Sequence, residues 1–194
     1  MKELFAILIG AMLIENFVLS KFLGICPFLG VSQKTSTALG MSGAVVFVNT
    51  LASLVTYLVN DLLLKPNGLE YLQTIAFILV IAALVQFVEI VLKKLVPPLY
   101  KALGIYLPLI TTNCAILGSA LINVDPARDY SLLEAVFFGF SAALGFSMAL
   151  VLFSGIRERL ETSDIPESFK GMPIALIAAS LVSVAFVGFA GLVI

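Results

Sequence analysis

The sequence predicts an all-α polytopic membrane protein, with six transmembrane helices in a single integral membrane domain over residues 1–194. Hydrophobic residues make up 61% of the chain and charged residues only 12%, whereas soluble domains are near half apolar and a quarter charged. The mean hydropathy of +1.13 reflects this imbalance. The apolar residues form continuous runs rather than alternating with polar residues. This pattern favours membrane-spanning helices over the strands of a membrane β-barrel.

Six apolar runs account for the six predicted helices. All but the first approach the roughly 20 residues that a helix needs to cross a bilayer. In chain order the runs are Leu4–Ser20, Ala38–Asn60, Tyr71–Leu92, Ala102–Asn123, Leu132–Ser154 and Gly171–Ile194. The longest connection between them, residues 155–170, is a charged turn, so no second domain is expected.

An apolar segment that is too short to cross a membrane follows the first run, at residues 22–31. It contains Gly24, Pro27 and Gly30, each of which would interrupt a regular helix. Irregular backbone is tolerated at membrane depth where other helices surround it. The segment therefore predicts a re-entrant half-helix, and a hydrophobic loop on the membrane surface is the alternative.

The fourth run shares a short pattern with this segment. Residues 26–30 read Cys-Pro-Phe-Leu-Gly, and residues 114–118 read Cys-Ala-Ile-Leu-Gly. Each copy falls early in one half of the chain, and three spans per half would invert the second half across the membrane. The pattern predicts two inverted three-helix repeats, at about 1–95 and 96–194, with broken helices carrying the cysteines. Because Leu and Gly are abundant, a chance match is the alternative.

The fourth run is itself expected to break before its cysteine. Pro108 lies inside this run, and Thr111, Thr112 and Asn113 follow it directly before Cys114. A proline inside a helix removes a backbone hydrogen bond. The polar side chains that follow can satisfy the backbone groups that the break leaves without partners.

Basic residues indicate the orientation in the membrane. The connections after the first, third and fifth runs hold eight Lys and Arg residues: Lys21, Lys34, Lys93, Lys94, Lys101, Arg157, Arg159 and Lys170. The opposite side holds three, which are Lys2, Lys65 and Arg128. Because positive charge gathers on the cytoplasmic side, both termini are predicted to lie on the outer side.

The composition also excludes several kinds of function. The chain has no histidine, which rules out imidazole acid–base catalysis and histidine-ligated metals. Its net charge of −1 offers no basic surface for nucleic acid. It carries no Gly-x-Gly-x-x-Gly motif and no phosphate-binding loop. An NAD or nucleotide site within this chain is therefore not expected.

Two cysteines, Cys26 and Cys114, are the main candidates for a functional site. They are expected to be buried beside helix breaks, where a free cysteine can also be an inert apolar side chain. Cysteine thiolates are the usual ligands of iron–sulfur clusters, which need four of them. If this chain supplies two, a second copy or a partner with the same motif must supply the others.

Two acidic residues, Glu15 and Glu89, are predicted to lie well inside spans. A carboxylate within the bilayer is costly and commonly marks an ion or proton path. Glu89 follows Gln86 on one helical face and lies about one turn from Lys93, toward the predicted cytoplasmic end. Both acids are candidates for an ion pathway, and a protonated carboxyl bonded to a neighbouring helix is the alternative for each.

Three segments resemble a known family. Residues 13–32 resemble the opening of the A subunits of the Rnf complex, and residues 107–118 and 155–159 resemble later signatures of those subunits. The resemblance covers essentially the whole chain. The E subunit of the sodium-translocating NADH:quinone reductase is similar as well, but Ile-Cys-Pro-Phe at residues 25–28 favours the Rnf assignment.

The resemblance implies a function in electron transport. Rnf complexes pass electrons between reduced ferredoxin and NAD, and couple this transfer to the pumping of Na⁺ or protons. Their A subunit pairs with the homologous E subunit, inserted in the opposite orientation, and the pair holds one 2Fe–2S cluster inside the membrane. Cys26 and Cys114 would then be iron ligands, and the chain would be a non-autonomous subunit of a translocating oxidoreductase.

The resemblance also implies partners and a location. Besides the E subunit, the other Rnf subunits (B, C, D and G) would surround this chain in a bacterial or archaeal cytoplasmic membrane. Two interpretations without redox chemistry remain: a small secondary transporter, and a purely structural membrane subunit with inert cysteines.

Overall fold

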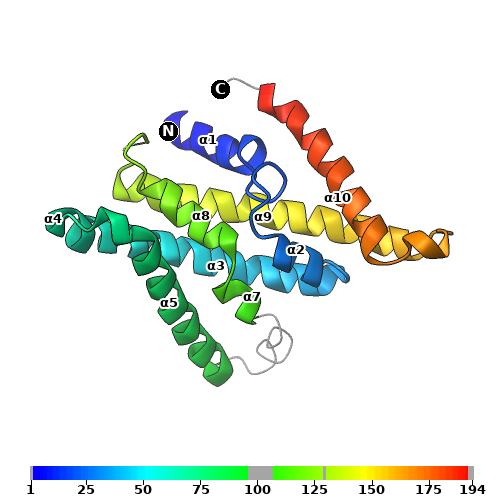
Figure 1. The fold of residues 1–194 in the computed structure, drawn as a ribbon, viewed down its shortest axis with the longest axis horizontal. Helices are drawn as coiled ribbons and strands as arrows, with labels where there is room; N and C mark the ends of the chain where they lie inside the picture. Colours follow the sequence, from blue (N-terminus) through cyan, green and yellow to red (C-terminus); the bar gives the residue numbers. More distant parts are fainter. Residues whose placement is uncertain (1, 96–106, 129, 192–194) are drawn as a thin grey trace.

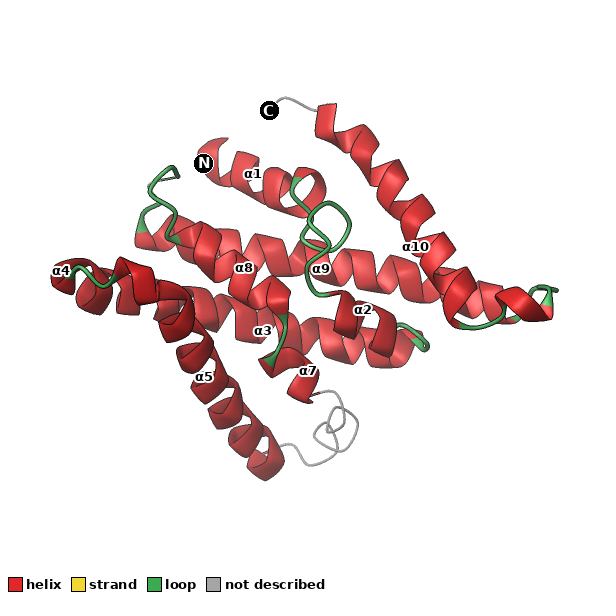
Figure 2. Cartoon of the chain, viewed as in Figure 1, coloured by secondary structure: helices red, strands yellow, loops and turns green. Residues whose placement is uncertain are grey.

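The computed structural model describes residues 2–95, 107–128 and 130–191 of the chain (Figures 1 and 2). Within these ranges the structure consists of helices joined by turns, and it contains no strand. The all-α prediction is therefore confirmed for the described part of the chain.

In the first half of the chain, two short helices, each followed by an irregular segment, precede the long helices. Helix α1 (Lys2–Ile9) continues into a π-helical turn, η1 (Gly10–Ile14). An irregular segment then leads to the short helix α2 (Ile25–Val31). Helix α3 (Thr35–Val59) continues through η2 (Asn60–Leu64) into α4 (Lys65–Asn67), and the turn η3 (Glu70–Leu72) leads into α5 (Gln73–Leu95).

In the second half, two short helices again precede a long one. The short helix α7 (Leu107–Thr111) ends at a break, and α8 (Cys114–Asn123) begins immediately after it. Helix α9 (Leu132–Glu161) is the longest of the described helices. The turn η4 (Glu167–Phe169), helix α10 (Met172–Val187) and η5 (Gly188–Gly191) follow.

Three of the described helices are long and apolar enough to cross a membrane: Thr35–Asn67, Gln73–Val91 and Leu132–Glu161. They correspond to the predicted second, third and fifth spans. The other three predicted spans correspond to shorter apolar helices, Leu4–Ile14, Pro108–Asn123 and Met172–Val187. The start of the predicted fourth span and the repeat boundary near residue 96 lie outside the described residues.

The predicted first span, Leu4–Ser20, was wrong at its carboxyl end, because the helix stops at Ile14. The Asn16 side chain caps the turn that follows: its Oδ1 accepts hydrogen bonds from the backbone N–H groups of Val18 and Leu19. Its Nδ2 donates to the carbonyl oxygen of Gly145 on α9, at 2.9 Å. A polar side chain thus ends the helix inside an apolar run.

The core lies between α3 and α9, which run side by side over most of their length (Figure 1). Helix α8 crosses this pair and contacts both helices. Aromatic rings fill the interface with α2: the Phe28 ring stacks on the Phe153 ring, with their centroids 4.4 Å apart. Helices α5 and α10 diverge from the pair and expose apolar side chains along their length, among them Leu79, Phe87, Leu181 and Val184. Such surfaces suit a lipid environment.

Candidate functional site

The two cysteines occupy equivalent positions in two short helices. Cys26 is the second residue of α2, and Cys114 is the first residue of α8. Each helix begins at an abrupt change of backbone direction: Gly24 before α2 has a left-handed conformation, and Asn113 before α8 is extended. A short helix forms within residues 22–31, and the predicted break before Cys114 is confirmed. That the short helix is a re-entrant half-helix stays a prediction.

The two cysteine segments contact each other directly. The backbone N–H of Gly24 donates a hydrogen bond to the Sγ atom of Cys114, at 2.9 Å. These two residues are ninety positions apart in the sequence. The hydrogen bond joins the turn that positions Cys26 to the side chain of the second cysteine, so the fold brings the two predicted site residues into one region.

Gly24 is required for this approach by its conformation and by its surroundings. Its φ of +81° is rarely adopted by residues with a side chain. A Cβ atom at this position would lie 2.9 Å from Phe146 Cε2 and 3.0 Å from Asn113 Oδ1. The close packing of the two segments therefore depends on the absence of a side chain.

Asn113 positions the second cysteine. Its Oδ1 accepts a hydrogen bond from the backbone N–H of Ala115, at 3.0 Å, and so caps the amino terminus of α8. Cys114 lies at the first position of this ten-residue helix, where the helix dipole favours a negatively charged side chain. The location therefore suits a thiolate that serves as a metal ligand.

Two residues of α9, to which the sequence assigned no site role, hold the carboxyl end of α2 and the start of α3. Arg157 Nη1 donates to the carbonyl oxygen of Leu29 at 2.6 Å and to Ser32 Oγ at 2.9 Å. Glu158 Oε1 accepts a hydrogen bond from the backbone N–H of Thr35, at 2.8 Å. The run Gly-Ile-Arg-Glu-Arg at residues 155–159 was the available signal, because it places charges at the end of an apolar helix.

Both cysteines are exposed in this chain, which corrects the expectation that they would be buried. An exposed position is not that of an inert core side chain, and it leaves both sulfur atoms open to a partner. Among the described residues, no group of three or more Cys, Asp or Glu side chains gathers to hold a metal ion. Two thiols are fewer than the four ligands of an iron–sulfur cluster, so a four-ligand site would need ligands from a further protein.

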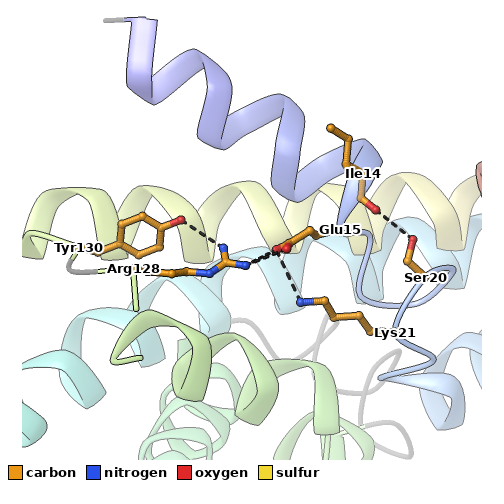
Figure 3. Close-up of polar contacts among 6 residues, drawn as sticks. All are labelled: Ile14, Glu15, Ser20, Lys21, Arg128 and Tyr130. Carbon is orange, nitrogen blue, oxygen red and sulfur yellow. Dashed lines mark hydrogen bonds and ion pairs between the residues drawn. The ribbon is translucent and has the colours of Figure 1, made fainter. Parts of the chain in front are cut away.

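Glu15 lies at the break after η1 and forms ion pairs (Figure 3). Its two carboxylate oxygens accept hydrogen bonds from Arg128 Nη2, at 2.7 and 2.8 Å. Lys21 Nζ lies 3.6 Å from the same carboxylate, and Arg128 Nη1 donates to the Tyr130 hydroxyl at 3.2 Å. About a third of the Glu15 side chain is exposed. In this structure Glu15 connects the end of η1 to the connection between α8 and α9.

Glu89 lies on α5, where its side chain is partly buried. Helix α5 packs against α7 and α8, so Glu89 belongs to a helix that borders the Cys114 segment. Lys93 follows one turn later on the same helix, and its side chain is exposed.

The chain matches a family model described as "Rnf-Nqr subunit, membrane protein" over residues 4–193. It is 60% identical over 186 residues to the A subunit of the Na⁺-translocating ferredoxin:NAD⁺ oxidoreductase complex of Acetobacterium woodii, and 96% of each chain is covered. It is 58% identical over 193 residues to the A subunit of the ion-translocating oxidoreductase complex of Syntrophotalea carbinolica, which covers 100% of this chain and 99% of that relative. The same-named subunit of Shewanella denitrificans is 56% identical over 193 residues, and both chains are covered completely.

Proposed function

Because this chain belongs to the Rnf–Nqr family of membrane subunits, we propose that it is the A subunit of an ion-translocating ferredoxin:NAD⁺ oxidoreductase complex. In that role it carries electrons across part of the membrane through a 2Fe–2S cluster, and this transfer is coupled to translocation of Na⁺ or protons. The observation that carries the proposal is the exposed pair of cysteines, which the hydrogen bond from Gly24 to Cys114 Sγ holds in one region.

The residues of the site fit a cluster shared between two chains. A 2Fe–2S cluster needs four thiolate ligands, and Cys26 and Cys114 supply two from one exposed surface. The homologous E subunit of the complex would supply the other two. The bound cluster would accept and release one electron at a time.

The chain's own residues hold and polarise the two sulfur atoms. The N–H of Gly24 donates to Cys114 Sγ, and a hydrogen bond to a thiolate stabilises its negative charge. Arg157 fixes α2 to α9 from the far end of that helix. These contacts keep the two sulfur positions constant while the partner supplies the remaining ligands.

The proposal includes six spans arranged as two inverted three-helix repeats. The order of elements supports it: a short helix, a break, a helix that begins at the cysteine motif and two longer apolar helices occur in each half. The three shorter apolar helices would complete their spans together with neighbouring segments. With six spans in total, both termini would lie on the same side of the membrane. The distribution of basic residues predicts that this is the outer side.

Substitution of the cysteines tests the cluster assignment. Cys26→Ala and Cys114→Ala should each abolish the electron paramagnetic resonance signal of the 2Fe–2S centre in the co-purified A and E pair, because each removes an iron ligand. Both variants should still insert into the membrane, since the helices remain apolar. Thr112→Ala is the matched control: Thr112 is exposed two residues before Cys114, and its hydroxyl bonds within its own helix. A full-intensity signal in both cysteine variants would contradict the assignment.

Glu89 is the proposed residue of cation uptake. Glu89→Gln keeps the shape of the side chain and removes its charge, so it should leave the cluster signal intact and impair ion-coupled transport at limiting sodium. The measurement is ferredoxin-driven uptake in vesicles that contain the whole complex. Asp61→Asn is a control, because Asp61 is an exposed acid that pairs with Lys65. Unchanged coupling in Glu89→Gln would remove this role.

A further inference from the structure

Asn113 caps the break before Cys114 with only one end of its side-chain amide. Its Oδ1 accepts the hydrogen bond from the backbone N–H of Ala115. Because only the oxygen of an amide can accept such a bond, this contact fixes which end of the side chain is Nδ2. Nδ2 is enclosed and makes no hydrogen bond within the described part of the chain, and the residue as a whole is 4% exposed. A buried donor without an acceptor therefore lies beside the second cysteine.

The asparagine at the break after η1 has no such unpaired group. The Oδ1 of Asn16 accepts from the backbone N–H groups of Val18 and Leu19, and its Nδ2 donates to the carbonyl oxygens of Met12 and Gly145. A buried asparagine thus caps each break, but the one at the second break uses only half of its amide.

Capping alone does not explain why residue 113 is an asparagine. Aspartate and serine cap helices about as well as asparagine does, and neither would leave an amide N–H group buried. A buried donor without an acceptor is costly and is rare in native proteins. We therefore expect the second end of the Asn113 amide to have an acceptor in the assembled protein.

The surroundings of Asn113 point to Cys114 Sγ as that acceptor. A Cβ atom on Gly24 would lie 3.0 Å from Asn113 Oδ1, and the backbone nitrogen of Gly24 lies 2.9 Å from Cys114 Sγ. Gly24 thus contacts both side chains. Its other close neighbours are the Phe146 ring and the Ala115 methyl group, which contain no oxygen, nitrogen or sulfur atom. The sulfur atom is the acceptor that this contact offers.

The charge of the sulfur atom determines how strongly it accepts. A thiol is a weak acceptor, whereas a thiolate is charged and accepts stronger hydrogen bonds. The Cys114 side chain is exposed, so it has room to turn when it becomes a ligand. Gly24 already donates to this sulfur, and Asn113 Nδ2 is the nearest unused donor of the cap beside it.

We propose that Asn113 is a positioning residue of the redox site, and that its Nδ2 donates a hydrogen bond to Cys114 Sγ when this sulfur is a thiolate ligand. The inference rests on the proposed function, because it needs the 2Fe–2S cluster. Hydrogen bonds to the sulfur atoms are among the factors that set the reduction potential of such clusters. A donor stabilises the more negative, reduced form more than the oxidised form, so the Asn113 amide raises the potential.

Asn113→Ser and Asn113→Asp test this role in the co-purified A and E pair. Both variants keep an oxygen that caps α8, and both lose the amide N–H group. In a redox titration of the electron paramagnetic resonance signal, Asn113→Ser should lower the ratio of reduced to oxidised cluster at a fixed potential by roughly tenfold. This is a shift of about 59 mV for one electron. Asn113→Asp should shift the potential further in the same direction, because a carboxylate also adds negative charge.

Asn123→Ser is the matched control. Asn123 lies on the same helix and is 2% exposed, and its side chain also has no partner within the described residues. It is separated from Cys114 by about 14 Å along the helix. The substitution removes the same amide far from the sulfur atoms, so the potential should remain that of the unchanged pair.

A second measurement detects the hydrogen bond itself. With ¹⁵N in the asparagine side chains, pulsed electron paramagnetic resonance of the reduced pair should show a weak coupling between ¹⁵N and the cluster. Asn113→Ser should remove this coupling, and Asn123→Ser should leave it. The absence of any ¹⁵N coupling in the unchanged pair would overturn the inference even if the variants failed to assemble.

The outcomes separate this inference from the proposed function. If the potential and the coupling are the same in the Asn113 variants as in the unchanged pair, the amide does not donate to the sulfur, and the proposed function stands. A shifted potential with an unchanged coupling would assign the effect to packing and would also overturn the inference. If the unchanged pair shows no 2Fe–2S signal, the proposed function itself fails.

Discussion

At the scale of single residues, Gly24 determines how closely the two cysteine segments approach. Its N–H is the donor to Cys114 Sγ, its backbone is left-handed, and its α-carbon faces Asn113 and Phe146. The three constraints coincide in a residue that neither binds a metal nor carries a charge. The sequence shows a glycine at this position, but only the packed structure shows why a residue with a side chain would not fit.

Gly24→Ala should therefore be costly. We expect the free energy of unfolding in detergent to fall by about 2–3 kcal/mol, from the strained backbone and the crowded Cβ atom. The cluster signal should weaken as well, because the donor to Cys114 Sγ moves. Gly43→Ala on α3 is the control: a Cβ there has no neighbour within 4 Å, and alanine favours a helix. Equal unfolding curves for the two variants would contradict the constraint at Gly24.

Glu15 is a second residue whose role the structure makes specific. Both of its oxygens accept from one nitrogen, Arg128 Nη2, and such charge-assisted hydrogen bonds are stronger than neutral ones, although both side chains remain about one-third exposed. Glu15→Gln should lower the free energy of unfolding by about 1 kcal/mol, and Arg128→Gln should have little further effect in the double variant. Thermal unfolding of the two single variants and the double variant measures this coupling. Additive losses would show that the two residues act independently, and an ion-coupling defect without loss of stability would support Glu15 as a residue of the ion pathway.

At the scale of elements, the pairing of α3 with α9 depends on small residues where the helices cross. A Cβ at Gly139 would lie only 2.6 Å from Ser53 Cβ, and Gly145 faces the backbone of η1 in the same way. Close approach of this kind is how helices associate in membranes, where burial of apolar surface gives no driving force between them.

Gly139→Ala should separate α3 from α9. We expect it to lower the free energy of unfolding by about 1–3 kcal/mol, because a methyl group is inserted into a close-packed contact. Gly155→Ala on the same helix is the control, since its Cβ would meet no atom within 4 Å. Ser53→Gly should partly restore stability in the Gly139→Ala background. If Ser53→Gly does not restore stability, the added methyl group of Gly139→Ala clashes with a residue other than Ser53.

The helices and their ends also show which features the sequence could predict and which it could not. Apolar runs, Pro108 and the cysteine motifs are local signals, so the long helices and both breaks at the cysteines were predictable. The end of the first helix was not, because Asn16 obtains its partner from Gly145, which is 129 residues away. The anchor formed by Arg157 and the exposure of the cysteines likewise depend on tertiary packing, which hydropathy does not encode.

At the scale of the whole molecule, the distribution of basic residues should determine the orientation of the chain in the membrane. Reporter fusions after Lys34, Lys101 and Arg159 should report the cytoplasm, and a fusion after Ile194 should report the outer side, because basic residues remain cytoplasmic. Paired reporters that are active on opposite sides of the membrane measure this directly. A cytoplasmic carboxyl terminus would contradict both the orientation and the inverted repeats.

The exposure of both thiols also has a consequence for how the protein is made. In the proposed complex, a copy of the chain that has not yet bound its partner would present two oxidisable thiols on its surface, and its survival would depend on the order in which the partner and iron bind. Cells that make this chain in excess would accumulate a form open to oxidation and to quality-control proteolysis. Under the same proposal, balanced synthesis of the two subunits would protect both, and the thiol reactivity of a membrane preparation would measure how much of the chain still awaits assembly.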